Sequence, residues 1–305
     1  MHHVMFILIC LIWGGSFILM KKASLAFGPI GVGAWRVVGG AAVLALFWVI
    51  FQRKRWPVRW RDLPPLAGVT VLFGYIWPFV MQPYLIHKNE DSAFFGVMVS
   101  FVPLMTIIVS IPMLGVWPTR RQIIGVVGGL IFMAMLLGEG VLRNISITDL
   151  LLAATVPLSY TISNTYIRRR FRDIPAMALS CTAAAIAAVV LLPTSLIKEG
   201  IRVDSNLTLA VASVATLGVL GTGVGPYFFC HLVQRRGPLF AGMTTYLVPL
   251  GALMWGKFDN ERITLLQLGA LFGVLVMVAL VQIGHRPVEQ PRAITLEPDG
   301  AAEGS

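Results

Sequence analysis

The sequence predicts an all-α integral membrane protein whose ten transmembrane helices form two inverted five-helix repeats. Ten long apolar stretches fill almost all of its 305 residues, 57% of the residues are hydrophobic and 12% are charged, which is roughly half the charge of a typical soluble domain. Because about 20 apolar residues cross the hydrocarbon core as a helix, these stretches predict helices rather than barrel strands. An odd number of spans per repeat makes the two halves insert in opposite orientations, an arrangement typical of secondary transporters.

The first repeat is predicted over residues 1–146 and contains five apolar stretches. They are Val4–Met20, Ile30–Phe51, Leu66–Ile86, Ala93–Leu114 and Gln122–Leu142. The stretch that starts at Val4 is too long for the core of a signal peptide and lacks a clear cleavage site, so we interpret it as the first span.

The second repeat is predicted over residues 147–284, and residues 285–305 are predicted to form a disordered cytoplasmic tail rich in Pro, Glu, Gly and Ala. Its apolar stretches are Leu150–Ile167, Ala176–Ile197, Leu207–Val233, Leu239–Trp255 and Ile263–Ile283. With a cytoplasmic N-terminus, 15 of the 24 lysines and arginines fall in inside segments and 8 in outside segments. This bias predicts that both termini are cytoplasmic. The formal charge of +10 reflects these connecting segments and does not indicate nucleic-acid binding.

A nearly constant sequence offset indicates that the second half duplicates the first. Three pairs of residues are each separated by 146 positions: Pro29 and Pro175, Gly96 and Gly242, and Pro103 and Pro249. The segment GVMVSFVPL at 96–104 aligns with GMTTYLVPL at 242–250. Coincidences of Gly and Pro are common in membrane proteins, but a constant offset across separate spans is much rarer.

Four motifs occur in order along the chain: Trp13–Phe17 (WGGSF), Arg36 just inside the second span, Tyr246–Leu250 (YLVPL) and Glu261–Gly269 (ERITLLQLG). At these residues the chain, from Val4 to Gln282, resembles the EamA-type branch of the drug/metabolite transporter superfamily. The resemblance implies a secondary transporter, an exporter of small metabolites or drugs that works by alternating access in a bacterial inner membrane. Val248 stands where the family often has Glu, and the first half lacks a counterpart of Glu261. Proton coupling through a buried carboxylate is therefore disfavoured.

Two tryptophans at unusual depth are candidates for contact with a substrate. Tryptophan normally lies at the membrane–water interface, whereas Trp13 and Trp77 fall near the middle of their predicted spans. We predict that they form an aromatic wall around the substrate, with core packing or lipid contact as the alternative. Ser16, which shares the first motif with Trp13, is assigned to the same site.

Arg36 is a charged candidate inside the membrane. Helix rise places it about 9 Å inside its span, and the sequence has no Asp or Glu within a span to pair with it, apart from Glu139 near a span end. An anionic group of the substrate is one candidate partner. Backbone carbonyls, water, or outward snorkelling of a structural arginine are the alternatives.

The sixth span has a polar face. Tyr160 and Asn164 are four residues apart, and Ser163 lies on a neighbouring stripe of the same helix. A polar face must point away from lipid, so these side chains are predicted either to contact the substrate or to form interhelical hydrogen bonds.

The eighth and ninth spans add three further candidates. Tyr227 and His231 are four residues apart, and Tyr227 follows the glycine-rich segment Gly221–Pro226, which is expected to bend or unwind. His231 is either a proton-linked switch or an interface histidine. Tyr246, which opens the ninth-span motif, is included in the same set.

Prolines and glycines in equivalent positions predict hinges and close helix packing. Pro103 and Pro249 are expected near the middle of their spans, where a kink can act as a hinge or remain a static bend. The GxxxG pairs at 125/129 and 269/273 are expected to hold the fifth and tenth spans together or to form a homodimer.

Other classes of function fit the sequence less well. No nucleotide-hydrolysing GxxxxGK[ST], HExxH or GxSxG motif occurs, the three cysteines lie inside apolar spans, and no metal-ligand spacing is present. We therefore predict no cofactor, no metal and no enzymatic activity, with a small-molecule substrate and the lipid bilayer as partners. The alternative is a membrane sensor or scaffold without transport. Such a role requires a soluble domain, which the sequence does not contain.

Overall fold

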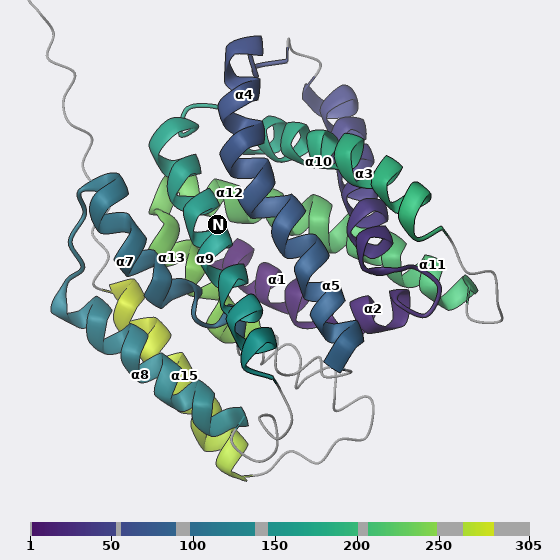
Figure 1. The fold of residues 1–305 in the computed structure, drawn as a ribbon. Coiled ribbons are helices and arrows are strands. Elements are labelled where there is room, and N and C mark those ends of the chain that lie inside the picture. Colours follow the sequence, from purple (N-terminus) through teal and green to yellow (C-terminus); the bar gives the residue numbers. More distant parts are fainter. Residues whose placement is uncertain are drawn as a thin grey trace, which may run out of the picture.

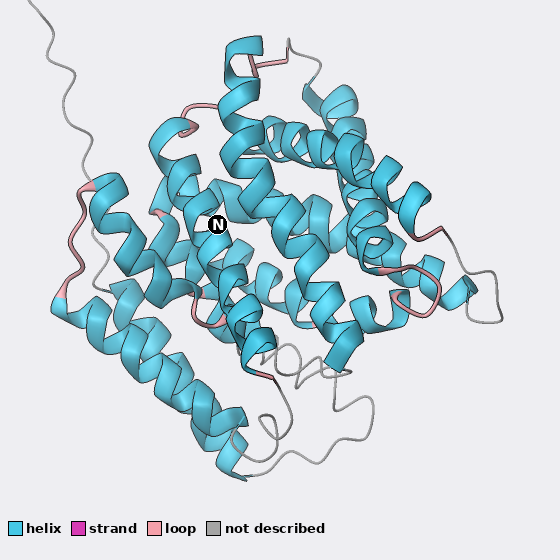
Figure 2. Ribbon diagram, viewed as in Figure 1, coloured by secondary structure: helices cyan, strands magenta, loops and turns pink. Residues whose placement is uncertain are grey.

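The computed structural model of the protein consists of helices joined by loops (Figures 1 and 2). It describes residues 2–52, 56–89, 98–137, 146–200, 207–248 and 265–283, and within these ranges every regular element is helical. The predicted all-α class is therefore confirmed. Over the same ranges, five helical segments are long and apolar enough to cross a membrane, namely His2–Ala23, Pro29–Phe51, Trp60–Asn89, Ala176–Lys198 and Leu207–Arg236.

The helices of the first half follow the predicted spans but are more often interrupted. Their bounds are α1 (His2–Gly14), α2 (Ser16–Ala23), α3 (Pro29–Phe47), η1 (Trp48–Gln52), η2 (Trp60–Asp62), α4 (Leu63–Pro65), η3 (Leu66–Ile76), α5 (Trp77–Asn89), α7 (Val102–Leu114) and α8 (Arg120–Leu137). The element η3 is a π-helix of 11 residues that continues directly into α5.

The second half has the same character. Its elements are α9 (Ile147–Arg170), α10 (Ala176–Lys198), α11 (Leu207–Thr216), η4 (Leu217–Val224), α12 (Gly225–Arg236), α13 (Pro238–Gly242) and α15 (Leu265–Ile283). The element η4 is a π-helix at the glycine-rich segment where a bend was expected. Pro249, the second predicted hinge, and the predicted tail at 285–305 lie outside the described residues.

Pro103 begins a helix rather than kinking the middle of one. The chain makes a turn at Ser100 and Phe101, and Pro103 occupies the first turn of α7. Proline is tolerated there because the backbone N–H groups of a first helical turn have no intrahelical acceptor. The expected continuous span is thus broken just before this residue.

Packing around α3 brings the two halves of the chain together. A Cβ atom on Gly39 would lie 3.1 Å from Cα of Gly218, so α3 and η4 cross with their backbones nearly in contact. At the end of α10, the carboxylate of Glu199 accepts hydrogen bonds from the backbone N–H groups of Ile30 (3.0 Å) and Gly31 (2.7 Å). A carboxylate at a helix N-terminus is stabilised by the helix dipole, so Glu199 holds α10 and α3 in register.

The helices α8 and α15 lie side by side (Figure 1). A Cβ on Gly125 would lie 2.9 Å from the backbone oxygen of Met277, and Gly273 faces the ring of Phe132. The GxxxG glycines at these two positions therefore allow close packing within one chain, which was one of the two expected roles. The homodimer stays a prediction.

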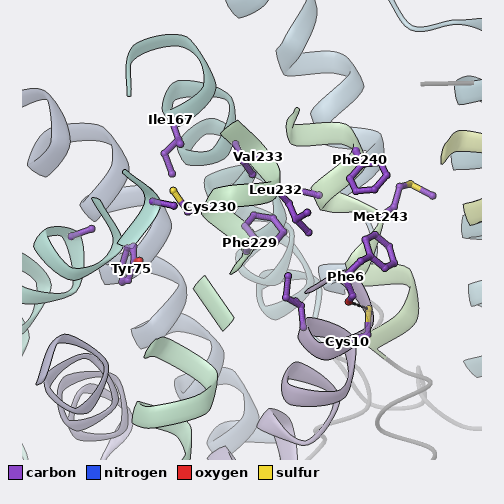
Figure 3. Close-up of a cluster of buried hydrophobic side chains, with 14 of the residues drawn as sticks. Phe6, Cys10, Tyr75, Ile167, Phe229, Cys230, Leu232, Val233, Phe240 and Met243 are labelled. Atoms are coloured by element: carbon purple, nitrogen blue, oxygen red, sulfur yellow. Dashed lines mark hydrogen bonds between the residues drawn. The ribbon is translucent and has the colours of Figure 1, made fainter. Parts of the chain in front are cut away.

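A buried apolar cluster joins α1, α12 and α13 (Figure 3). The rings of Phe6 and Phe240 pack edge to face with centroids 5.7 Å apart, and Cys10 donates a hydrogen bond to the backbone oxygen of Phe6 at 3.0 Å. This cluster anchors the first helix against the second half of the chain.

Lys88 and Asp149 form an ion pair at the ends of α5 and α9, with Nζ 2.7 Å from Oδ1. Among the described residues it is the one such pair between a lysine or arginine and a carboxylate. Asp149 lies just outside the predicted sixth span, and the hydrogen bond from Lys88 lowers the pKa of its carboxyl group from the ordinary value of 3.8.

Candidate substrate-binding cavity

A cavity of about 110 Å³ lies between helices from both halves of the chain. Its walls come from α1, α2, α3, η3, α5 and α7 in the first half and from α9, α10, η4 and α12 in the second. The volume corresponds to about four water molecules at the ~30 Å³ that each occupies in the liquid, or to part of a small organic molecule. Sites of this kind typically combine apolar walls with a few polar groups that orient the ligand.

Aromatic side chains form much of the wall. They are Trp13, Phe17, Tyr75, Phe79, Tyr160 and Phe229. Trp13 packs against Phe229 with ring centroids 5.1 Å apart, and its Nε1 donates to the backbone oxygen of Gly221 at 3.2 Å. The indole is therefore held by contacts with η4 and α12, both from the other half of the chain.

Arg36 lines the cavity from α3, with only 4% of its surface exposed. Its Nε donates to Oγ1 of Thr222 at 3.0 Å, and Nη1 lies 3.6 Å from the sulfur of Met20. The guanidinium carbon sits over the ring of Phe79, 3.9 Å from its centroid. The snorkelling alternative therefore does not describe this arginine, whose head group is held inside the protein.

All of these contacts with Arg36 come from neutral groups. A desolvated cation–π contact contributes about 2 kcal/mol and a hydrogen bond to a charged group about 1.5–3 kcal/mol, which together are comparable with the several kcal/mol that removing a charge from water costs. Among the described residues no carboxylate forms an ion pair with Arg36. The site thus holds a buried positive charge without a negative partner in the described part of the chain.

The polar face of α9 turns toward the same cavity. Tyr160, Ser163 and Asn164 all line it. The hydroxyl of Ser163 donates to the backbone oxygen of Thr70 at 3.2 Å, so it also joins α9 to η3. Asn164 is 7% exposed and makes no side-chain hydrogen bond to a described residue, which leaves its amide free to bind a ligand. Ser16, from α2, lines the cavity and donates to the backbone oxygen of Ile12 at 3.1 Å.

Four predicted contact residues do not line this cavity. Trp77 is 36% exposed and donates to Thr155 at 2.8 Å, Tyr227 packs against Phe228, and His231 stacks on His2 with centroids 5.8 Å apart. Tyr246 is fully buried, and its hydroxyl donates to the backbone oxygen of Val126 at 2.7 Å.

The geometry of α12 explains two of these positions. Pro226, Phe229 and Cys230 line the cavity, and their spacing of three and one residues puts them on one face of the helix. Tyr227 and His231 lie four apart on a different face, and His231 faces the start of α1. The prediction identified the correct helix but the other face of it.

The structure adds lining residues that the sequence analysis did not single out. Tyr75, Phe79 and Gln82 line the cavity from η3 and α5, and Thr222 positions Arg36 from η4. The spacing of 75, 79 and 82 is that of one helical stripe, so this set was visible in the sequence as an aromatic and polar face. Over the described residues, no group of three His, Cys, Asp or Glu side chains is placed to hold a metal ion.

The model of the EamA-like transporter family matches residues 1–138 and again residues 148–283. The chain belongs to this family. It is 26% identical over 269 residues to the uncharacterized transporter YoaV of Bacillus subtilis (strain 168), covering 86% of this chain and 90% of the relative. It is 22% identical over 278 residues to the uncharacterized transporter YvbV of the same organism, covering 89% and 88%.

A solved structure described as "Crystal structure of protein" has the same fold as this EamA-family chain. The two superpose with a TM-score of 0.74 at 18% sequence identity, covering 93% of this chain and 97% of the other. At this identity the likeness concerns the fold alone.

Proposed function

We propose that this EamA-family protein is a secondary transporter that moves small organic molecules across a membrane by alternating access. The observation that carries the proposal is the central cavity, whose walls come from both halves of the chain. A site between two halves can open to either side when one half rocks against the other. Family membership and two relatives named as transporters support the same function.

In this proposal ten helices cross the membrane as two inverted five-helix repeats. The family model matches once in each half of the chain, which supports a duplication. The π-helical segments η3 and η4 fall in the third and eighth predicted spans, which are equivalent positions of the two repeats, and both line the cavity. Non-α geometry within helices is frequent at functional sites.

The proposed orientation places both termini in the cytoplasm of a bacterial cell, with the protein in the inner membrane and transport directed outward. The distribution of lysine and arginine supports the orientation. Labelling of a cysteine introduced at Asn89, in a variant without the native cysteines, is expected from the outside only. Labelling from the cytoplasm only would overturn the topology.

The energy source we propose is exchange or uniport. Among the described residues that line the cavity there is no Asp, Glu or His, so these residues provide no carboxylate or imidazole to carry a coupled proton. Transport in proteoliposomes should therefore persist when the pH gradient is collapsed and should be accelerated by substrate on the opposite side.

The direct test is a thermal-shift screen of purified protein against amino acids, nucleosides, sugars, organic acids, polyamines and cationic drugs. A ligand at a hundredfold excess over Kd stabilises the folded state by about 2.7 kcal/mol. Each hit is then tested for flux in proteoliposomes. Trp13→Ala and Asn164→Ala should weaken both readouts at least tenfold, because both residues line the cavity.

Trp77→Ala is the matched control, since Trp77 is a partly exposed tryptophan that does not line the cavity. It should leave the affinity for the hit within twofold of the original. Flux that survives both cavity substitutions unchanged would show that transport does not use this site.

A further inference from the structure

We propose that the cavity selects organic anions, with the anionic group bound at Arg36 and an apolar body packed against the aromatic wall. The inference rests on the proposed transport function and names the substrate class for that site. Its first support is charge. Among the described residues that line the cavity, Arg36 is the single basic side chain, and none is Asp, Glu or His. That part of the wall therefore presents one positive charge and no negative one.

The hydrogen bonds of Arg36 to described residues leave its Nη2 unpaired. Nε is engaged by Thr222 and Nη1 by the sulfur of Met20, and one face covers the ring of Phe79. These partners are neutral. Nη2 has no hydrogen-bond partner among the described residues, and the adjacent position is a glycine, Gly221, whose added Cβ would lie 3.7 Å from Nη2. The space beside Nη2 is therefore free of side-chain atoms from this position.

An anion is the ligand that best satisfies such a group. The guanidinium is planar, stays charged and donates to carboxylate or phosphate oxygens through two N–H groups at once. Since Nη2 is free and Nη1 contacts only a sulfur, a weak acceptor, both nitrogens can bind one oxyanion. The same charge repels a cationic ligand, and no carboxylate of the described lining offsets the repulsion.

The rest of the wall specifies the body that carries this anionic group. Trp13, Tyr75, Tyr160 and Phe229 line the cavity together with Phe79, and aromatic walls bind flat or branched apolar groups. The cavity volume of about 110 Å³ suits a compact body such as a single ring. Asn164, whose amide has no partner among the described residues, can donate to the anion or bind a second polar group.

The test compares ligands that differ in charge but share one body. Purified protein in detergent is titrated with 3-phenylpropionate, its uncharged amide 3-phenylpropionamide, the cation 3-phenylpropylamine, and 2-phenylethylphosphonate. The same four head groups are tested on a branched aliphatic body. We expect at least one of the anions to bind at least tenfold more tightly than the amide of the same body, and the amines to bind more weakly than the amides. Comparing the carboxylate with the phosphonate shows which of these two anionic groups the site prefers.

Arg36→Gln should reduce the affinity for the anion at least tenfold and leave the affinity for the amide within threefold. Lys21→Gln is the control, because it removes one positive charge from an exposed position of α2 outside the cavity. It should leave the affinities for all ligands unchanged.

Asn164→Asp provides a second variant if Arg36→Gln does not fold. The substitution hardly changes shape and adds a negative charge beside the ligand. It should weaken anion binding at least tenfold with little effect on the amide. A loss of affinity that is equal for anion and amide would indicate general damage and would count against the proposal.

The outcomes separate this inference from the proposed function. Amides or amines that bind as tightly as the anions, or no binding by any anion, would overturn the substrate class. If such neutral or cationic compounds also cross proteoliposome membranes, transport stands and the class is wrong. Anions that bind through Arg36 but do not cross would support the class and refute transport.

Discussion

Replacing Thr222 with valine tests how the candidate cavity holds Arg36. Thr222 is fully buried in η4, and its Oγ1 accepts the hydrogen bond from Nε of Arg36 at 3.0 Å. Valine has the same shape but no hydroxyl. The substitution therefore removes one hydrogen bond and leaves the Nε–H group without a partner inside the protein.

Two ranges of hydrogen-bond energy bound the expected loss of unfolding free energy in Thr222→Val. A hydrogen bond to a charged group contributes about 1.5–3 kcal/mol in soluble proteins, whereas hydrogen bonds between membrane helices average about 0.6 kcal/mol and reach about 1.7 kcal/mol. Because the donor here is charged and buried, we expect the upper part of the membrane range. Thr222→Val should lower the free energy of unfolding by about 1.5 kcal/mol.

The assay is unfolding by SDS titration in mixed micelles, followed by tryptophan fluorescence. A double-mutant cycle with Arg36→Gln isolates the pair, and its coupling energy should be about 1.5 kcal/mol by the same argument. Thr222→Ser keeps the hydroxyl, so it should retain the proposed affinity of the cavity for organic anions. Thr222→Val should lose part of that affinity. A coupling energy below about 0.5 kcal/mol, or equal anion affinities in the two variants, would refute the positioning role.

Two further predictions concern contacts outside the cavity. Glu199→Ala removes both acceptors from the first turn of α3 and should lower the free energy of unfolding by about 1–2 kcal/mol. Glu199→Gln keeps one acceptor and should lower it by about half as much. Equal stability of the original protein and both variants in the SDS titration would contradict the capping role. The second uses pH. Lys88 holds the pKa of Asp149 below its ordinary value of 3.8, so the ion pair stabilises the fold above that pH and its contribution disappears as the pH falls through the lowered pKa. Thermal denaturation below about pH 4 should show this loss of stability in the original protein and not in Asp149→Asn. The same dependence of stability on pH in both proteins would rule out a contribution from this ion pair.

Several features of the protein were predictable from sequence because their causes are local. Long apolar stretches with few charges form helices in any arrangement that spans a membrane, and the described helices overlap the predicted spans. Trp13, Arg36 and Asn164 were identifiable as candidates because lipid penalises polar or charged groups at that depth. The structure places all three around one cavity, whereas their contact with a substrate remains a proposal.

Which face of each helix meets the cavity was decided only by the tertiary structure. Periodicity shows which residues share a stripe but not which neighbour that stripe will meet, so Tyr227 and Phe229 could not be told apart from α12 alone. The partner of Arg36 was equally hidden, because Thr222 is 186 residues away along the chain. The sequence by itself determined the helices and the residues too polar to face lipid. Helix packing determined their partners, because contacts between distant segments depend on how all the helices fit together at once.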